Sequence, residues 1–281
     1  ASHSNKHKTV NFLPASSREK VTDLSLPLEG HGSQAILDDL DEFLKQCVKT
    51  NRPEFMNPLW GGLNVAGFAG EVVAALTNQS MYTYELSPIA TLIEKAVIER
   101  MMEIVGFGEG FGTLTTGGSN GNMLGMLCAR QYADPMSSLN GFDGTKYVAF
   151  VSEEAHYSVL MSANVLGIGY QNLVKVKCDA SGRMKPESLI DEINRATADG
   201  RVPFCIIATS GTTVRGAFDP LREIANIAHD NDIWLHVDAA WGGSCLFSRR
   251  YRGLMDGIEL VDSICWDCLL YTSPSPRDGL L

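Results

Sequence analysis

The sequence predicts an α/β domain whose mostly parallel β-sheet is flanked by helices, and three observations support this prediction. Strand-like and helix-like segments alternate regularly through the second half of the chain. The strand segments near 204–209 and 233–238 are almost continuous apolar runs, as in strands that are buried on both faces. With 281 residues, 44% of them hydrophobic and 20% charged, the chain can bury one large domain with a small appendage.

An arm and two helices are expected in the first 106 residues. Residues 1–32 are polar and contain several prolines and glycines, which is typical of an arm. From Ser33 to Val48 apolar residues recur at intervals of three and four, which predicts an amphipathic helix capped by Ser33. Ser87 and Pro88 open a second predicted helix, and Gly106 lies just past its end.

The alternating elements follow residue 146. Their expected positions are strands near 146–151, 172–178, 204–209 and 233–238, and helices near 157–166, 186–198 and 220–230. Ligands of such sheets bind at the carboxyl ends of the strands. The residues at those ends are therefore the candidates for chemistry.

Charge and composition exclude several functional classes. The formal net charge of −10 argues against a surface for nucleic acid or for an anionic membrane. No apolar run is long enough for a membrane helix, and the first residues lack the core of a signal peptide, so we expect a cytoplasmic protein. The seven scattered cysteines indicate neither a disulfide framework nor a zinc site, and no metal is predicted.

The segment 115–122, with the sequence TTGGSNGN, leads directly into the helical run 123–132. Backbone N–H groups and hydroxyls would converge there at a helix N-terminus, which favours anion binding. The alternative is an ordinary glycine-rich turn. Because the pattern is neither a Walker loop nor a GxGxxG after a strand, it does not indicate a nucleotide.

Asp238 ends the buried run 233–237 and is followed by small residues, AAWGG with one tryptophan. A buried charge is costly unless it is paired, and the protonated ring nitrogen of a cofactor would be a suitable partner. The small side chain of Ala240 would let a flat ring lie against the backbone. The alternative is a carboxylate that caps the next segment.

Two further polar segments follow strands. Residues 209–213, TSGTT, offer hydroxyls, although such clusters are common in loops, and His156 could stack on a ring or transfer protons, although a lone histidine is more often structural. We expect the anion site, His156, the hydroxyl cluster and Asp238 on four successive carboxyl edges of one sheet. Together they describe a pocket for pyridoxal phosphate.

With these residues the sequence resembles the group II pyridoxal-phosphate-dependent amino-acid decarboxylases, and is similar in pattern to glutamate and cysteine sulfinate decarboxylases. The resemblance covers about residues 10–267, and its most specific stretch is HVDAAWGG at 236–243. It implies the type I, aspartate-aminotransferase-like fold of pyridoxal-phosphate enzymes. It also implies a homodimer whose active sites are shared across the interface.

The resemblance assigns roles to individual positions. It implies that Gly118, Ser119 and Asn120 hold the cofactor phosphate. It also implies that His156 stacks on the pyridine ring and that Ala240 packs on the opposite ring face.

Two more positions complete the implied pocket. Thr209 would lie near the ring hydroxyl, and Asp238 would pair with the ring nitrogen. His156 and Asp238 are the residues expected to take part in catalysis.

The sequence departs from the family pattern in two places. The glutamate and cysteine sulfinate enzymes carry a glutamine after the asparagine that matches Asn57, a position expected to contact substrate, whereas this chain has Pro58. Where the family has His-Lys, whose lysine binds the cofactor covalently, this chain has Leu269 and Leu270. We therefore expect the chain as written to be inactive, with residues 268–281 forming a tail outside the family pattern.

The resulting prediction has three segments and one main function. Residues 1–75 form an N-terminal arm and helical segment, residues 76–267 form an incomplete cofactor-binding large domain, and the C-terminal small domain is missing. The intact enzyme would decarboxylate an L-amino acid, with glutamate, aspartate or cysteine sulfinate expected, to the amine and carbon dioxide. The alternatives are another type I reaction, as in a lyase or aminotransferase, or a non-catalytic protein of the same fold.

Overall fold

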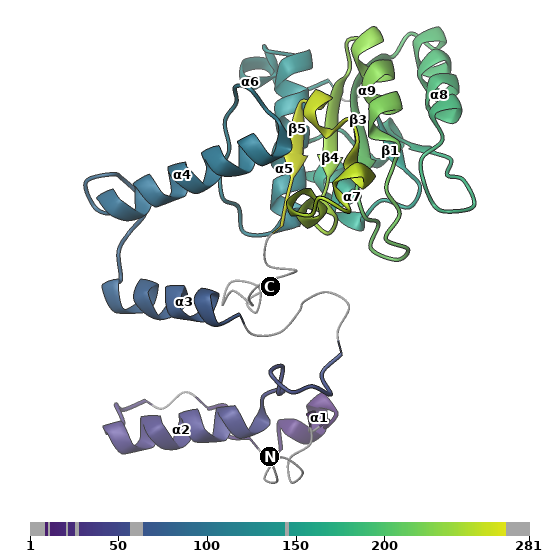
Figure 1. The fold of residues 1–281 in the computed structure, drawn as a ribbon. Coiled ribbons are helices and arrows are strands. Elements are labelled where there is room, and N and C mark those ends of the chain that lie inside the picture. Colours follow the sequence, from purple (N-terminus) through teal and green to yellow (C-terminus); the bar gives the residue numbers. More distant parts are fainter. Residues whose placement is uncertain are drawn as a thin grey trace.

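A computed structural model describes residues 9–10, 12–20, 22–25, 28–56, 64–143 and 146–267. At its centre is a five-stranded parallel sheet with the strand order β2-β1-β3-β4-β5 (Figure 1). The strands are β1 Tyr147–Ser152, β2 Leu173–Val176, β3 Val202–Thr209, β4 Trp234–Asp238 and β5 Ser263–Cys265. The predicted α/β fold is thereby confirmed, although β5 was not expected from the sequence.

Alternate residues of the strands enter two separate cores, one on each face of the sheet. On β3, Ile206 and Ala208 belong to one core, and Cys205 and Ile207 belong to the other. Successive side chains of a strand point to opposite faces, so a strand buried on both faces must be apolar throughout. The continuous apolar runs of the sequence therefore specify the central position of β3.

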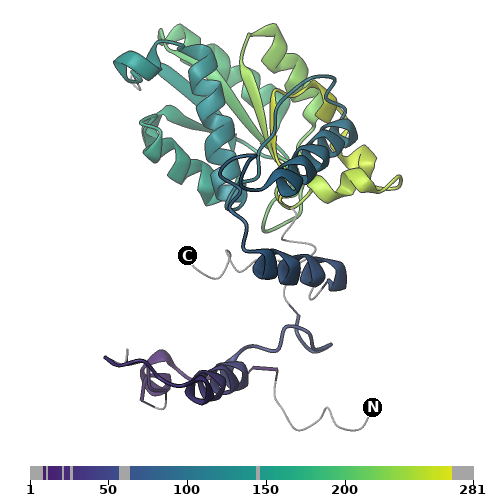
Figure 2. The same cartoon turned by 90° about the vertical axis from the view of Figure 1, so that its left-hand side faces the viewer.

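Helices cover both faces of the sheet (Figures 1 and 2). The helices α8 (Pro186–Ala198) and α9 (Leu221–Asp230) pack on one face, and their apolar residues share the core of Ile206 and Ala208. The opposite face is covered by α5 (Gly118–Ala133) and α7 (Tyr157–Val165), whose buried residues share the core of Cys205 and Ile207.

The ends of α4 (Pro88–Val105) agree with the local sequence signals. Ser87 is its N-cap, Pro88 takes the first helical position, and Gly106 follows the last turn with a φ of 104°. Proline costs nothing at a position whose N–H has no partner in the helix, and glycine adopts the left-handed conformation readily. Both predicted boundaries of this helix are confirmed.

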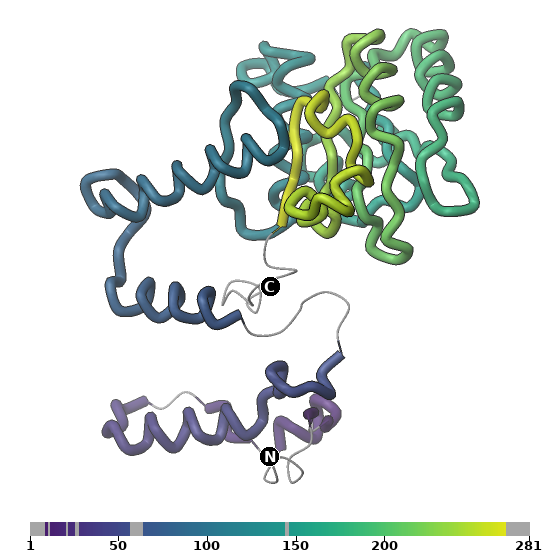
Figure 3. Tube along the Cα trace, in the orientation of Figure 1, coloured from purple at the N-terminus to yellow at the C-terminus, as the bar shows by residue number. Residues whose placement is uncertain are grey.

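The first three helices lie away from the sheet, as the ribbon and the tube both show (Figures 1 and 3). They are α1 Ala15–Arg18, α2 Ser33–Gln46 and α3 Val65–Thr77. None of these helices contains a buried residue. Among the described ranges, no helix is both long and apolar enough to cross a membrane.

Three details differ from the sequence-based expectations. The predicted cap Ser33 is the first helical residue of α2, and Gly32 occupies the N-cap position. The helix α3 was not predicted. It also crosses the proposed segment boundary at residues 75 and 76, and the division into segments remains a prediction.

The remaining short elements are α6 Ser137–Asn140 and the 3₁₀ turns Tyr170–Asn172, Gly243–Phe247, Arg252–Met255 and Ile258–Leu260.

Candidate active site

Strand alternation directs three polar side chains toward the same helix. Thr209 and Asp238 are aligned Cα partners at the ends of β3 and β4, and His236 lies two residues before Asp238. Their neighbours Ala208 and Val237 belong to the core under α8 and α9, so these polar residues face α5. The carboxyl end of the sheet therefore presents a carboxylate and a hydroxyl side by side beneath α5.

The N-terminus of α5 comes close to the end of β4. Gly118 is the first helical residue, and a Cβ placed on it would lie 3.1 Å from the Cβ of Ala240. The thiol of Cys265 donates to the carbonyl oxygen of Gly118 at 3.2 Å. The first N–H groups of a helix have no partner within the helix, so this terminus can bind an anion beside Asp238.

Asp238 is buried, with 6% of its surface exposed, and both of its oxygens accept hydrogen bonds. The backbone N–H of Ala240 donates to Oδ1 at 3.1 Å, and the side-chain amide of Asn122 donates to Oδ2 at 2.8 Å. Burial raises the pKa of Asp238, whereas these two donors and the nearby His156 lower it. The bond from Ala240 is the local contact expected of a carboxylate that caps the next segment, which was the alternative interpretation. The bond from Asn122 joins Asp238 to a distant part of the chain.

His156 is connected to Asp238 through two side chains. It is the N-cap of α7, and its Nδ1 accepts the backbone N–H of Ser158 at 3.3 Å and lies 2.9 Å from the Ser158 hydroxyl. The second N–H of the Asn122 amide donates to that same hydroxyl at 3.1 Å. Asn122 therefore joins the histidine and the carboxylate that were predicted separately.

Two hydroxyls at the carboxyl end of β3 have no hydrogen-bond partner among the described residues. Thr209 Oγ1 and Ser210 Oγ are both fully buried and unpaired. Buried polar groups in proteins are nearly always hydrogen-bonded, so each exception calls for an explanation. A polar group of a bound ligand next to Asp238 would supply the missing partner of Thr209.

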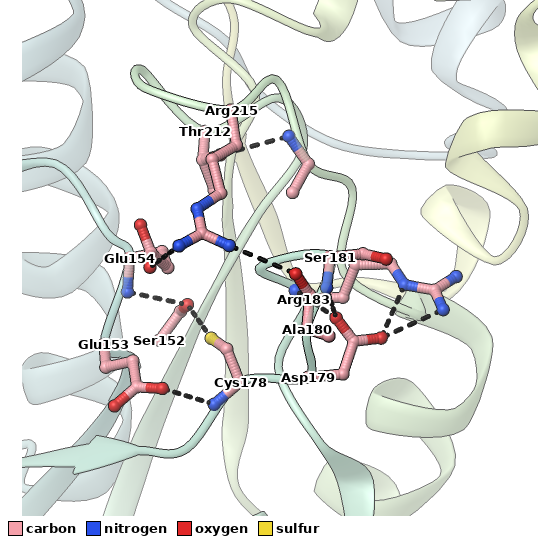
Figure 4. Close-up of polar contacts among 11 residues, drawn as sticks. Ser152, Glu153, Glu154, Cys178, Asp179, Ala180, Ser181, Arg183, Thr212 and Arg215 are labelled. Atoms are coloured by element: carbon pink, nitrogen blue, oxygen red, sulfur yellow. Dashed lines mark hydrogen bonds and ion pairs between the residues drawn. The ribbon is translucent and has the colours of Figure 1, made fainter.

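A polar cluster joins the loops after β1, β2 and β3 (Figure 4). Arg215 lies between two of these loops, 3.6 Å from the Glu154 carboxylate and donating to the Ala180 carbonyl at 3.2 Å. Glu153 accepts the backbone N–H of Cys178 at 2.7 Å. These contacts hold the segment that carries His156 against its neighbours.

The structure brings together most, but not all, of the predicted positions. Gly118, Ala240, Thr209, Asp238 and His156 surround one region at the carboxyl end of the sheet. One expectation was wrong: the anion segment does not follow a strand in the part of the chain that the structure describes, and it reaches the site as the start of α5.

The remaining predicted residues contribute less to this geometry. Ser119 is exposed and Asn120 is half-buried in the first turn of α5. Asn57 lies outside the described residues, as do Leu269 and Leu270.

Sequence reasoning did not single out Asn122, Ser158 or His236. The signal for Asn122 was present, because asparagine is a poor helix former and here lies within a helix next to glycines. Its importance depends on contacts with residues 36 and 116 positions away, which no local pattern reveals.

A sequence comparison decides the family. The profile of the pyridoxal-dependent decarboxylase conserved domain matches residues 14–271. The chain belongs to this family. The match is close to the range of residues 10–267 over which the resemblance was recognised from motifs.

Curated relatives support the same membership. The chain is 41% identical to the acidic amino acid decarboxylase GADL1 of Bos taurus over 261 residues, which are 92% of this chain and 50% of that protein. It is also 41% identical to the cysteine sulfinic acid decarboxylase of Homo sapiens over 250 residues, 89% of this chain and 51% of that protein. The chain thus spans about half the length of the curated relatives it matches.

Solved structures share its fold. The crystal structure of mouse CSAD matches with a TM-score of 0.90 and 40% identity, covering 93% of this chain and 55% of that one. A Catharanthus roseus tryptophan decarboxylase matches with a TM-score of 0.81 and 25% identity, covering 92% of this chain and 57% of that one. The fold of this decarboxylase family is therefore present here over about half of its full length.

Proposed function

We propose that this chain forms the pyridoxal-phosphate pocket of an acidic amino-acid decarboxylase in which Asp238 partners the ring nitrogen of the cofactor. One observation carries the proposal: the buried carboxylate of Asp238 lies beside the buried, unpaired hydroxyl of Thr209. A ring that offers a protonated nitrogen and a hydroxyl matches both groups. Membership of a pyridoxal-dependent family supports this choice of cofactor.

The chemical character of the site residues fits this cofactor. Burial raises the pKa of Asp238, and a cationic ring nitrogen would offset that effect by stabilising the carboxylate. The start of α5 offers N–H groups for a phosphate. Because Gly118 has no Cβ and Ala240 has a short side chain, the backbones approach each other at this edge.

Each residue would contribute a separate part of the chemistry. When bound, pyridoxal phosphate supplies an electron-accepting ring that stabilises the negative charge left by a departing carboxylate. Asp238 would keep a proton on the ring nitrogen, which strengthens this effect. Thr209 would donate its hydroxyl to the ring oxygen, His156 would cover one ring face, and Gly118, Ser119 and Asn120 would bind the phosphate.

An acidic substrate is the proposal for the amino acid. Two kinds of relatives that cover most of this chain are named acidic amino acid decarboxylase and cysteine sulfinic acid decarboxylase. We propose Asn57 as a substrate contact. Covalent attachment of the cofactor would depend on a lysine at the position now occupied by Leu270.

A homodimer is the proposed assembly. The helices α2 and α3 contain no buried residue, yet Leu40, Phe43, Phe68 and Leu76 are large apolar side chains exposed on them. Large apolar side chains exposed together on helices that lie away from the sheet (Figure 1) are typical of surface that another chain covers. A second copy of the chain is the proposed partner.

A binding titration tests the proposed cofactor site. Pyridoxal 5′-phosphate is titrated into the full chain and into Asp238→Asn, which keeps the shape but removes the charge. We expect binding by the wild-type chain, and about tenfold weaker binding by the variant because a charge-assisted hydrogen bond is lost. Equal dissociation constants for the two proteins would contradict the role of Asp238.

Product analysis tests the proposed reaction. The chain would be extended to the length of its relatives and would carry Leu269→His and Leu270→Lys. Glutamate, aspartate and cysteine sulfinate are then offered separately. Carbon dioxide and a primary amine are the expected products, whereas a keto acid would indicate an aminotransferase.

A further inference from the structure

A series of hydrogen bonds continues from Asn122 into the sheet, away from the proposed cofactor site, and its members are buried or partly buried. The Oδ1 atom of Asn122 lies 3.0 Å from Nε2 of His236, and Nδ1 of His236 lies 2.8 Å from the hydroxyl of Ser263. The indole Nε1 of Trp234 donates to that hydroxyl at 2.8 Å. The series therefore runs from Trp234 on β4 across β5 and back to Asp238.

The ends of this series have fixed donor and acceptor roles. An indole N–H can only donate, and an ionised carboxylate can only accept. Because the Asp238 carboxylate accepts from the Asn122 nitrogen, the oxygen of the Asn122 amide faces His236, and Nε2 of His236 carries the hydrogen that it donates to this oxygen. In a neutral imidazole Nδ1 then has no hydrogen, so it accepts from the Ser263 hydroxyl, which in turn accepts from Trp234.

The same argument fixes the orientation of the Asn122 amide. Its oxygen accepts from His236, and both N–H bonds of its nitrogen are left to donate, one to Asp238 and one to Ser158. The opposite orientation would place the oxygen against the Asp238 carboxylate. His236 is fully buried, and burial lowers its pKa to about 4, so the imidazole is neutral near pH 7.

We propose that Ser263 and His236 are positioning residues that lock the Asn122 amide in the orientation that holds Asp238 ready for the ring nitrogen of the cofactor. The inference rests on the proposed function only for the identity of the ligand. Its consequence is that a hydroxyl on β5, which touches neither Asp238 nor His156 in the described contacts, controls how well the pocket recognises a ring nitrogen.

The test compares two ligands that need no lysine. Pyridoxamine 5′-phosphate has no aldehyde, and its deaza analogue has a C–H group in place of the ring nitrogen. Their dissociation constants are measured for the full wild-type chain. We expect at least about tenfold preference for the nitrogen-containing ligand, the size of a charge-assisted hydrogen bond.

Variants of Ser263 then separate positioning from general damage. Ser263→Ala should reduce this preference by about threefold or more, with the affinity for the deaza analogue unchanged, because the Asn122 amide is no longer held in one orientation. Ser263→Thr restores a hydroxyl and should restore the preference. Ser137→Ala removes a buried hydroxyl that lies outside the series, and it should leave the preference intact.

A second variant and a spectroscopic readout complete the test. Asn122→Leu removes both donors and should abolish the preference whatever the tautomer of His236. Nitrogen-15 NMR of labelled histidine reports the tautomer directly, with the His236 signals assigned from their loss in His236→Gln. We expect the Nε2–H form in the wild-type chain and a second form in Ser263→Ala.

The outcomes distinguish the two proposals. If the wild-type chain prefers the ring nitrogen and Ser263→Ala does so equally, the positioning role is overturned and the proposed function stands. If the wild-type chain binds neither ligand, the proposed function fails, and the tautomer spectrum decides the hydrogen-bond series. An Nδ1–H or protonated His236 in the wild-type chain at neutral pH overturns the series.

Discussion

Asp219 is a buried carboxylate that joins two loops. It accepts the backbone N–H of Met184 at 2.6 Å and that of Thr209 at 2.7 Å, and only 2% of its surface is exposed. Burial raises its pKa to about 6, against the opposing effect of the two N–H donors. The residue thus ties the end of β3, which carries Thr209, to the segment after β2.

The raised pKa of Asp219 predicts a pH effect on stability. The folded state holds this proton up to about pH 6 and the unfolded state releases it near pH 4, so stability falls as pH rises between these values. The free energy of unfolding falls by roughly 2–3 kcal/mol over this range. In urea unfolding across this range, the wild-type chain should lose stability relative to Asp219→Asn as the pH rises, because the amide of the variant does not titrate. A difference that is constant with pH would contradict the prediction.

At the scale of elements, glycines let α5 approach the sheet. A Cβ on Gly121 would lie 2.6 Å from Sγ of Cys265, and a Cβ on Gly125 would collide with the imidazole of His236. Gly118, Gly121 and Gly125 are spaced so that they lie on one face of the helix. This close approach is what brings Asn122 within hydrogen-bonding distance of β4.

Substitution of these glycines should therefore have an effect opposite to the usual one. In an open helix interior, glycine to alanine stabilises by up to about 1 kcal/mol. Gly125→Ala should instead destabilise by roughly 1–3 kcal/mol because the added methyl overpacks the interface with His236. Chemical denaturation measures the change.

The matched control is Gly70→Ala in α3, where a Cβ would meet nothing within 4 Å. That variant should be neutral or slightly stabilising. If Gly125→Ala behaves in the same way, α5 does not pack on β4 as described.

At the scale of the whole molecule, apolar surface on the first helices predicts self-association. Phe68, Val72 and Leu76 are exposed at spacings of four along α3, and Ile89 and Ile93 are exposed in the same way on α4. Phe68→Ser with Val72→Ser should shift the chain toward monomer in sedimentation experiments. Loss of this apolar area weakens association because its burial contributes about 25 cal/mol per Å².

A polar neighbour provides the control for association. Glu71 lies on α3 and is exposed, so Glu71→Gln changes the charge while keeping the apolar residues. It should leave the sedimentation profile unchanged. A wild-type chain that is monomeric at all concentrations would contradict the proposed homodimer.

The sequence by itself determined the sheet and most of its elements. The apolar runs of β3 and β4 indicated strands buried on both faces, and Ser87, Pro88 and Gly106 marked the ends of α4. These signals are local, because a continuous apolar run and a helix cap each depend on neighbouring residues. Motifs also indicated Gly118, His156, Thr209, Asp238 and Ala240, which the structure brings to one edge of the sheet.

Only the tertiary structure decided how these groups are connected. The bonds from Asn122 to Asp238, His236 and Ser158 join residues far apart in the chain, and they form because α5 packs closely on β4. The short strand β5 was equally invisible locally, since three residues acquire strand geometry by pairing with β4. Long-range hydrogen bonds and edge pairing depend on packing distances, and a sequence pattern does not contain them.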